Sequence, residues 1–163
     1  LVGGWGFLAG DEGSGAWIGR QAITQSTMVL DARHRNRATD MHRAVIEHCG
    51  RSRDEMLTWL WGAEPARFAE IALLVVEYAG RGDRAALAIA DEAGREVDAL
   101  ADALDPGRNV PLALVGGLAE PLNPFLPERL RIWATAAQEE PISGALMLAE
   151  GRAPDETIMW QNR

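Results

Sequence analysis

Hydrophobic residues in the first two thirds of the chain recur at three- and four-residue steps, the spacing typical of amphipathic helices. The pattern predicts a first helix from about Ser14 to about Leu30, followed by an exposed, arginine-rich connection at residues 31–37. The second helix would be capped by Thr39 or Asp40. Further helices are expected, and the apolar positions place them at about 40–48, 53–61, 65–79 and 84–104. The middle of the chain is therefore a helical layer.

Several of these helices open on residues that favour a helix start. Ser14 and Asp83 are expected N-caps, because a short polar side chain can accept a hydrogen bond from the first free N–H groups of a helix. Ser52 and Glu55 form the S-x-x-E pattern of a capping box. Pro65 suits the first turn of the helix that follows.

The pattern changes at Asn109. An apolar run at residues 110–115 is followed at once by Gly116 and Gly117. This order predicts a buried strand that ends in a glycine turn, with the next helix starting at Leu118.

Two further short segments and a last helix complete the expected structure. Residues 1–10 are expected to form a short strand or an extended turn broken by glycine. A second short strand is expected at 131–134, and an apolar helix at 142–150. Neither an internal repeat nor a domain boundary stands out, so one domain is expected.

The strongest candidate for a binding segment is residues 3–15, GGWGFLAGDEGSG, in which six of thirteen residues are glycine. A tight turn needs only one or two glycines, so a ligand-binding loop is favoured over a solvated turn. Gly4 and Gly6 would let a ligand approach the backbone, and Asp11 would accept hydrogen bonds from its hydroxyl groups. Trp5 would pack either on an apolar edge of the ligand or in the core. Backbone N–H groups that lead into a helix suit an anion or a hydroxyl-rich ligand.

Two later segments carry weaker signals. Residues 112–118 read as strand, paired glycine and helix, which places free N–H groups at the carboxyl edge of a sheet. A tight turn without a ligand explains the same residues. In PISGAL, residues 141–146, Ser143 and Gly144 either cap a helix or provide small side chains that admit a flat ring such as adenine.

Composition excludes several classes of function. The chain has 16 Lys+Arg, all of them Arg, and 24 Asp+Glu, for a net charge of −8. A P-loop and Schiff-base chemistry both need lysine and are excluded within this chain. The negative charge argues against nucleic acid and anionic membrane surfaces as partners, and no apolar run is long enough to span a bilayer.

Cysteine and histidine give no candidate metal site. Cys49 is the single cysteine, which excludes an internal disulfide and favours a reducing, cytoplasmic location. The spacing of His34, His42 and His48 around it matches no common zinc pattern, so no metal ligands are expected.

Taken in order, three segments resemble the C-terminal half of bacterial N-acetylglucosamine and glucosamine kinases: GGWGFLAGDEGSGAWIG, VPLALVGGLAEPL and EPISGALMLA. These kinases belong to the actin-like ATPase superfamily, in the branch that also holds the activating ATPases of 2-hydroxyacyl-CoA dehydratases. Those activators hold an iron–sulfur cluster through more than one cysteine per subunit. The single Cys49 therefore favours the sugar kinases.

The resemblance implies an α/β fold, namely an RNase H-like lobe of the actin-type ATPases with a helix-rich insertion, mostly helical by residue count. Residues 1–163 would form a single C-terminal lobe, and the N-terminal lobe would lie outside this chain. Sugar and MgATP would bind between the two lobes. The phosphate-gripping loop and the aspartate base would belong to the N-terminal lobe, so no catalytic residue is expected here and this lobe alone would be inactive.

The resemblance also assigns binding residues to this chain. Residues on the sugar side would be Gly4, Trp5, Gly6 and Asp11. Residues near the nucleotide would be Gly116 and Gly117, with Ser143, Gly144 and Ala145 near the adenosine. Glu12 would either orient the glycine loop or contact metal-bound water.

The implied function is ATP-dependent phosphorylation of N-acetylglucosamine or glucosamine by the intact protein, with ATP and Mg²⁺ required. The alternative is a non-catalytic sugar- or nucleotide-sensing or interaction domain of the same fold. A mainly helical scaffold whose glycine loops are only turns is a second alternative. Exposed apolar surface on an isolated lobe would favour self-association as a homodimer.

Overall fold

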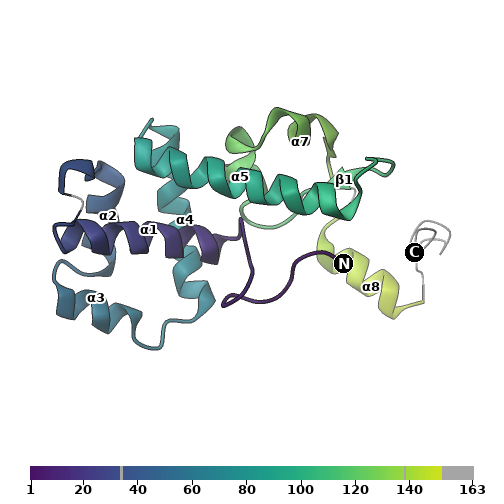
Figure 1. Cartoon of the computed structure of the whole chain (residues 1–163). Helices are drawn as coiled ribbons and strands as arrows, with labels where there is room; N and C mark the ends of the chain where they lie inside the picture. The colour runs from purple at the N-terminus through teal and green to yellow at the C-terminus, as the bar shows by residue number, and fades with distance from the viewer. Residues whose placement is uncertain (34, 138, 152–163) are drawn as a thin grey trace.

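The computed structural model describes residues 1–33, 35–137 and 139–151 and is mostly helical (Figure 1). Its first helices are α1 (Gly15–Leu30), the short 3₁₀ helix η1 (Arg35–Arg37), α2 (Asp40–Cys49), α3 (Arg53–Leu60), α4 (Pro65–Gly80) and α5 (Arg84–Leu104). The later elements are β1 (Leu112–Ala113), α6 (Ala119–Leu122), the 3₁₀ helix η2 (Asn123–Phe125), α7 (Glu128–Trp133), β2 (Ala134–Thr135) and α8 (Pro141–Ala149). The long helices lie where the apolar spacing predicts them.

The expected helix starts are confirmed in their local geometry. Ser14 Oγ accepts a hydrogen bond from the N–H of Trp17 at 3.2 Å, and Ser52 Oγ accepts one from Glu55 at 3.3 Å. The capping box of α3 is only half formed, because the Glu55 carboxylate accepts from the N–H of Arg51 rather than from that of Ser52. Both hydrogen bonds satisfy N–H groups that have no partner inside the helix.

The core lies where α4 crosses α1, and α2 and α5 each pack against both of these helices (Figure 1). Ile18 of α1 and Ile71 and Val75 of α4 are fully buried at this crossing. The two helices can approach closely because α1 carries Gly19, where a Cβ atom would overlap the carbonyl oxygen of Phe68.

Asp83 joins the N-termini of two helices. Its Oδ1 accepts hydrogen bonds from Ala85 at 2.9 Å and Ala86 at 3.1 Å in α5, and its Oδ2 accepts one from Met41 at 3.0 Å in α2. Burial alone would raise the pKa of Asp83, but these N–H groups and Thr39 outweigh burial and hold the pKa below its ordinary value. The ionised carboxylate is therefore the form that stabilises the fold.

The strands are shorter and more exposed than the sequence predicts. β1 and β2 form one parallel pair, with Leu112 opposite Ala134 and Ala113 opposite Thr135. The prediction of a buried strand over residues 110–115 is wrong in both length and burial, since the strand covers only β1 and none of the six residues is buried; Val110 and Val115 are 45% and 55% exposed. A strand extends only where a neighbouring strand pairs with its backbone, and in the described structure β1 pairs with β2 alone.

Two other expected strands are corrected. Residues 131–133 form the end of α7, so the extended part of that segment covers only β2. Residues 1–10 contain no strand and form an irregular segment with a turn, in which the N–H of Ala9 donates to the carbonyl of Gly6. The expected α/β content therefore reduces, in the described residues, to one two-stranded pair beside a helical body.

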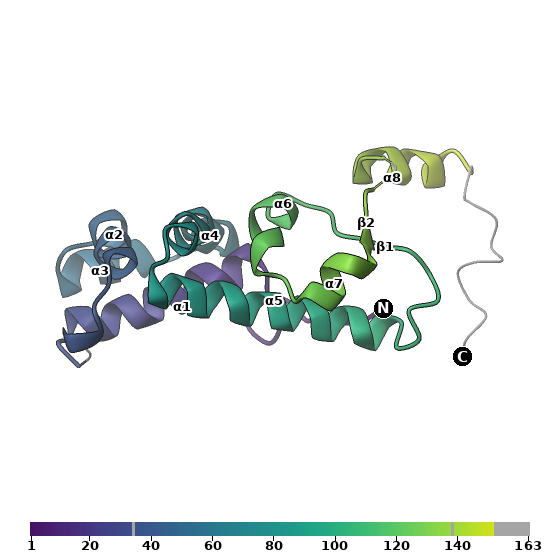
Figure 2. The same ribbon diagram turned by 90° about the horizontal axis from the view of Figure 1, so that it is seen from above.

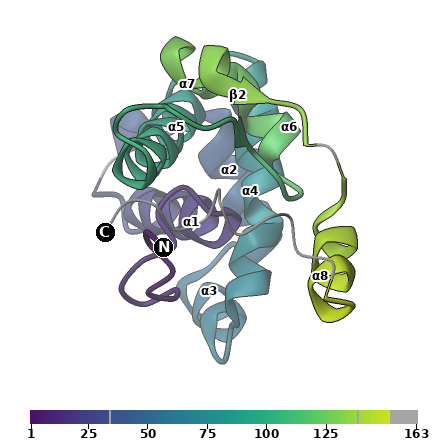
Figure 3. The ribbon, with the colours of Figure 1, turned by 90° about the vertical axis from the view of Figure 1, so that its right-hand side faces the viewer.

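Helix α8 stands away from the helical body (Figures 2 and 3). None of its residues is buried, and Ile142, Leu146 and Leu148 are 67%, 56% and 58% exposed. The helix is thus confirmed, but its apolar residues have no packing partner within the described chain. None of the described helices is both long enough and apolar enough to cross a membrane.

Replacing Asp83 with Asn tests its role at the two helix starts. We expect Asp83→Asn to lower the free energy of unfolding by about 1–2 kcal/mol at pH 7, because an amide accepts fewer hydrogen bonds and carries no charge. A carboxyl group with a lowered pKa stabilises the fold above its unfolded pKa and loses that effect as pH falls through its folded pKa. The difference between the variant and the parent should therefore shrink below about pH 4.

Urea unfolding at several pH values measures this difference. Asp54→Asn is the matched control, because Asp54 is also in the first turn of a helix but is exposed. In the described structure its carboxylate accepts no hydrogen bond from another helix. Equal losses at pH 7 and pH 3 would contradict the proposed role of the Asp83 charge.

Candidate functional site

The two glycine-rich segments meet at one cavity of about 310 Å³, called here the glycine cavity. Gly13–Gly15 form one wall, residues 114–119 form the other, and Val97, Leu122 and Leu126 complete the lining. The cavity thus joins the end of the first sequence motif to Gly116 and Gly117 of the second. No charged side chain lines it, so its surface consists of apolar side chains, backbone and one hydroxyl group.

The first wall is held in place by direct contact between α5 and the backbone before α1. Gly13 has φ +77°, and a Cβ atom there would lie 2.7 Å from Val97 Cγ2 and 3.0 Å from the carbonyl oxygen of Ala93. Only glycine fits this combination of close approach and left-handed backbone. The N–H of Ser14 then donates to the carbonyl of Asp11 at 2.9 Å, which closes the turn into α1.

The residues expected on the sugar side lie on the irregular segment before this turn. Phe7 fixes the segment to the helical body: its ring lies 5.0 Å from that of Phe68, and its carbonyl accepts a hydrogen bond from Arg20 at 3.1 Å. Gly4 and Gly6 are exposed, and Trp5 is 81% exposed. The core interpretation of Trp5 is therefore wrong for the described structure, and its ring is accessible to a ligand.

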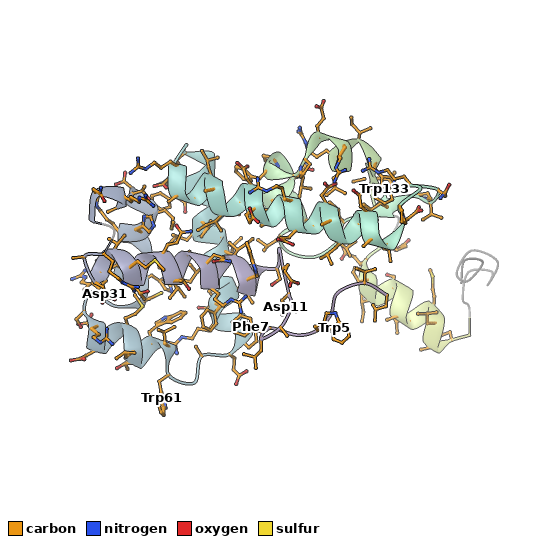
Figure 4. The ribbon with its side chains drawn as sticks, in the orientation of Figure 1. Trp5, Phe7, Asp11, Asp31, Trp61 and Trp133 are labelled. Carbon is orange, nitrogen blue, oxygen red and sulfur yellow. The ribbon has the colours of Figure 1, made fainter. Side chains whose placement is uncertain are left out.

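Asp11 lies next to the start of α1, whereas Trp5 lies farther out along the same segment (Figure 4). Asp11 has φ +62°, an uncommon conformation for a residue with a side chain. Its carboxylate is half-buried and has no hydrogen bond or ion pair within the described residues. The carboxylate is therefore able to accept hydrogen bonds from a ligand, and a role in sugar binding stays a prediction. Glu12 is also half-buried, and its role stays open.

The third predicted segment lies near the second but not in the glycine cavity. A neighbouring cavity of about 460 Å³ is lined by Gly116 and Gly117 on one side and by Ala137, Glu139 and Pro141 on the other. Ser143 is half-buried, Gly144 and Ala145 are exposed, and these three residues line neither cavity. The structure thus brings the start of α8 close to Gly116 and Gly117. Adenosine contacts from residues 143–145 stay a prediction.

A set of ion pairs that the sequence analysis missed, called here the acidic clasp, holds the second wall in place. It consists of Asp98 and Asp102 on α5 with Arg108 and Arg129. Asp98 Oδ2 accepts a hydrogen bond from Arg129 Nε at 2.7 Å, and Asp102 pairs with Arg129 at 2.9 Å and with Arg108 at 2.8 Å. Asp98 is buried, whereas Arg129 is about half exposed. The only sequence signal was the four-residue spacing of two aspartates on one helix face.

The clasp extends to β1, the strand that leads into Gly116 and Gly117. Trp133 Nε1 donates to the carbonyl of Val110 at 3.0 Å, and the Arg108 guanidinium lies 5.2 Å from the centre of the Trp133 ring. The hydrogen bond from Arg108 lowers the pKa of Asp102, and the N–H of Val110 lowers that of Asp105. These contacts tie the entry of β1 to the C-terminal half of α5.

Other candidate chemistry is absent from the described residues. No group of three or more His, Cys, Asp or Glu side chains is arranged to hold a metal ion. Cys49 is buried, and burial raises the pKa of its thiol to about 12, so the thiolate nucleophile is scarce at neutral pH.

Comparison with known proteins gives similarity to two amino-sugar kinases by name. No protein-family model matches the chain. Over 149 residues the chain is 26% identical to glucosamine kinase GspK of Vibrio cholerae serotype O1, and the match covers 91% of this chain and 50% of the relative. A crystal structure from Chromobacterium violaceum, provisionally described as an N-acetylglucosamine kinase, is similar with a TM-score of 0.84 and 41% identity, over 90% of this chain and 50% of that one.

The resemblance to amino-sugar kinases is confirmed. The chain spans about half the length of these two amino-sugar kinases. At this identity and TM-score, the fold of this chain as a whole is similar to half of the Chromobacterium violaceum protein.

Removing the buried carboxylate of the clasp should loosen the second wall. We expect Asp98→Ala to lower the free energy of unfolding by about 1–3 kcal/mol, with the smaller values favoured because solvent can compensate the half-exposed Arg129. Amide hydrogen exchange in residues 110–117 should become faster. Asp91→Ala, an exposed change on the same helix, should change stability by less than about 0.5 kcal/mol. Unchanged exchange in residues 110–117 of Asp98→Ala would refute the clasp.

Proposed function

We propose that this chain is the C-terminal lobe, residues 1–163, of an actin-like ATPase that phosphorylates N-acetylglucosamine or glucosamine with ATP. The observation that carries the proposal is the glycine cavity, where Gly13–Gly15 and Gly116–Gly117 face each other across one space. The similarity to two proteins named for amino-sugar phosphorylation supports the choice of reaction.

The glycine cavity suits the nucleoside part of ATP. Its volume of about 310 Å³ lies at the lower end of ligand pockets, and its apolar lining would accept a flat aromatic ring. The exposed Gly116 and Gly117 would let the ring or ribose lie against the backbone. No arginine or carboxylate lines the cavity, so the triphosphate and Mg²⁺ would be held mainly by residues outside it. Bound MgATP would supply the phosphoryl group for transfer to a sugar hydroxyl.

The segment before α1 suits the sugar. The Asp11 carboxylate would accept hydrogen bonds from sugar hydroxyl groups and so orient the sugar for attack. The exposed Trp5 ring would cover an apolar face of the sugar and exclude water from it. In this mechanism the chain binds and orients both substrates. The proton of the attacking hydroxyl would be removed by a base in the other half of the protein, as the kinase resemblance implies.

Exposed apolar residues mark where that other half would pack. Val110 and Val115 flank β1, and Ile142 and Leu146 lie on α8, and all four are at least 45% exposed. Unpaired edges of a two-stranded pair also favour the addition of further strands. We propose that the rest of a kinase-length protein covers this surface and closes the substrate cleft.

Replacing Asp11 with Asn tests the sugar side in the full-length protein. We expect Asp11→Asn to lower kcat/KM for the amino sugar by roughly 10–100-fold, because one charge-assisted hydrogen bond is weakened. The KM for ATP should not change. Coupled measurement of ADP release with glucosamine, N-acetylglucosamine and glucose gives both constants, and Asp91→Asn is the matched surface control. Unchanged sugar kinetics in Asp11→Asn would remove Asp11 from the site.

Replacing Gly117 with Val tests the nucleotide side. A Cβ atom at Gly117 would meet no atom within 4 Å, so the fold should tolerate the change while the added methyl groups narrow the cavity. We expect Gly117→Val to raise the KM for ATP by about tenfold or more, with the sugar KM unchanged. Gly80→Ala is the control, because an added Cβ atom at Gly80 would also meet no atom within 4 Å and Gly80 lies outside both cavities.

The same assays separate the kinase from the sensing alternative. A full-length protein whose melting temperature rises with an amino sugar or ATP, but which releases no ADP, would be a binding module. An equal rise of the ATP and sugar KM values in Gly117→Val would argue against separate sites for the two substrates.

A further inference from the structure

A second cavity lies at the opposite end of α1 and α5 from the glycine cavity. It measures about 400 Å³ and is called here the arginine cavity; its lining residues are Gln25, Met28, Val29, Arg37, His42, Arg84 and Ala85. Helices α1 and α5 lie side by side along the helical body (Figures 1 and 2). The two cavities share no lining residue, so the arginine cavity is separate from the proposed substrate site.

Two arginines give this cavity its chemistry. Within the described residues, neither Arg37 nor Arg84 has an ion pair or a side-chain hydrogen bond, whereas nearby Arg43 and Arg81 are paired with Asp40 and Glu77. The chain carries a net charge of −8, so carboxylates are in excess over arginines. Arginines that face a cavity without a carboxylate partner are therefore available to bind an anion.

Nearby acidic groups are already engaged elsewhere. Asp83 precedes Arg84, but both of its oxygens accept backbone N–H groups of α2 and α5. Asp40 pairs with Arg43 on the exposed side of α2.

The other lining residues add hydrogen-bonding and apolar surface. His42 is buried, and its Nδ1 accepts a hydrogen bond from the N–H of Thr39 at 3.1 Å. Gln25 provides an amide. Met28, Val29 and Ala85 form an apolar wall that would pack against the carbon part of a ligand.

We propose that the arginine cavity binds a small organic phosphate monoester. Two exposed arginines that line one cavity supply positive charge for a doubly charged phosphate, and the apolar wall suits the organic group attached to it. This site is additional to the proposed kinase site, and its occupancy does not depend on catalysis.

Calorimetric titration of the full-length protein with phenyl phosphate tests the proposal, with benzyl alcohol, benzoate and inorganic phosphate as comparison probes. We expect phenyl phosphate to bind with a Kd of about 1 mM or tighter, and more strongly than the other three probes. Binding should weaken as salt is added. Arg37→Gln and Arg84→Gln should each weaken it by about tenfold or more, and the double variant should abolish it.

Arg43→Gln is the matched control, because Arg43 lies at the same end of the molecule and is paired with a carboxylate. Circular dichroism and melting temperature without ligand check that each variant is folded. The proposal is overturned if phenyl phosphate does not bind saturably, or if benzoate binds equally well. It is also overturned if binding survives in the double variant and is displaced by AMP, because the anion would then occupy the nucleotide site.

Discussion

The close contact between the backbone at Gly13 and helix α5 links the apolar body of the molecule to its candidate site. A side chain at this position would overlap Val97, so the start of α1 can lie against α5 only because residue 13 is glycine. A second glycine, Gly19, allows the other close approach, where α4 crosses α1 in the apolar core. The contact at Gly13 places the first glycine segment where the second can face it. Fold and candidate site thus depend on the same backbone approach.

The second wall of the site depends on charge rather than on apolar packing. β1 is too short to fix the glycine loop by strand pairing, and much of the surrounding apolar surface is exposed. The acidic clasp and the Trp133 hydrogen bond attach this wall to α5 instead. Arg129 donates two hydrogen bonds to the Oδ2 atom of the buried Asp98, and such charge-assisted hydrogen bonds are more directional than an apolar contact. The position of Gly116 and Gly117 is therefore set by a small number of polar contacts.

The helices could be predicted because their signals are local. Ser14 and Asp83 mark helix starts because their side chains accept hydrogen bonds from backbone N–H groups within three residues. The apolar spacing then defines the buried face of each helix. The strands could not be predicted with correct ends, because the length of β1 depends on which neighbour pairs with it. Nor could the clasp, since Asp98 and Arg129 are far apart in sequence. Sequence motifs located the glycine segments and the kinase resemblance, but only the structure placed Gly13–Gly15 opposite Gly116–Gly117 and left residues 143–145 outside the cavity.

Cys49 gives the protein an internal reporter of opening. It is the single thiol in the chain, and it lies buried at the end of α2 with its pKa raised to about 12. Alkylating reagents react with thiolate, so at neutral pH the folded protein would be labelled almost only through molecules in which α2 has separated from the core. The rate of labelling therefore reports how often α2 separates from the core. The folded state favours the neutral thiol, whereas in the unfolded chain the thiol ionises above about pH 9. The free energy of unfolding would therefore fall as pH rises from about 9 toward 12. Ionisation of Cys49 at alkaline pH would therefore weaken the packing of α2 through a residue that has no part in either cavity.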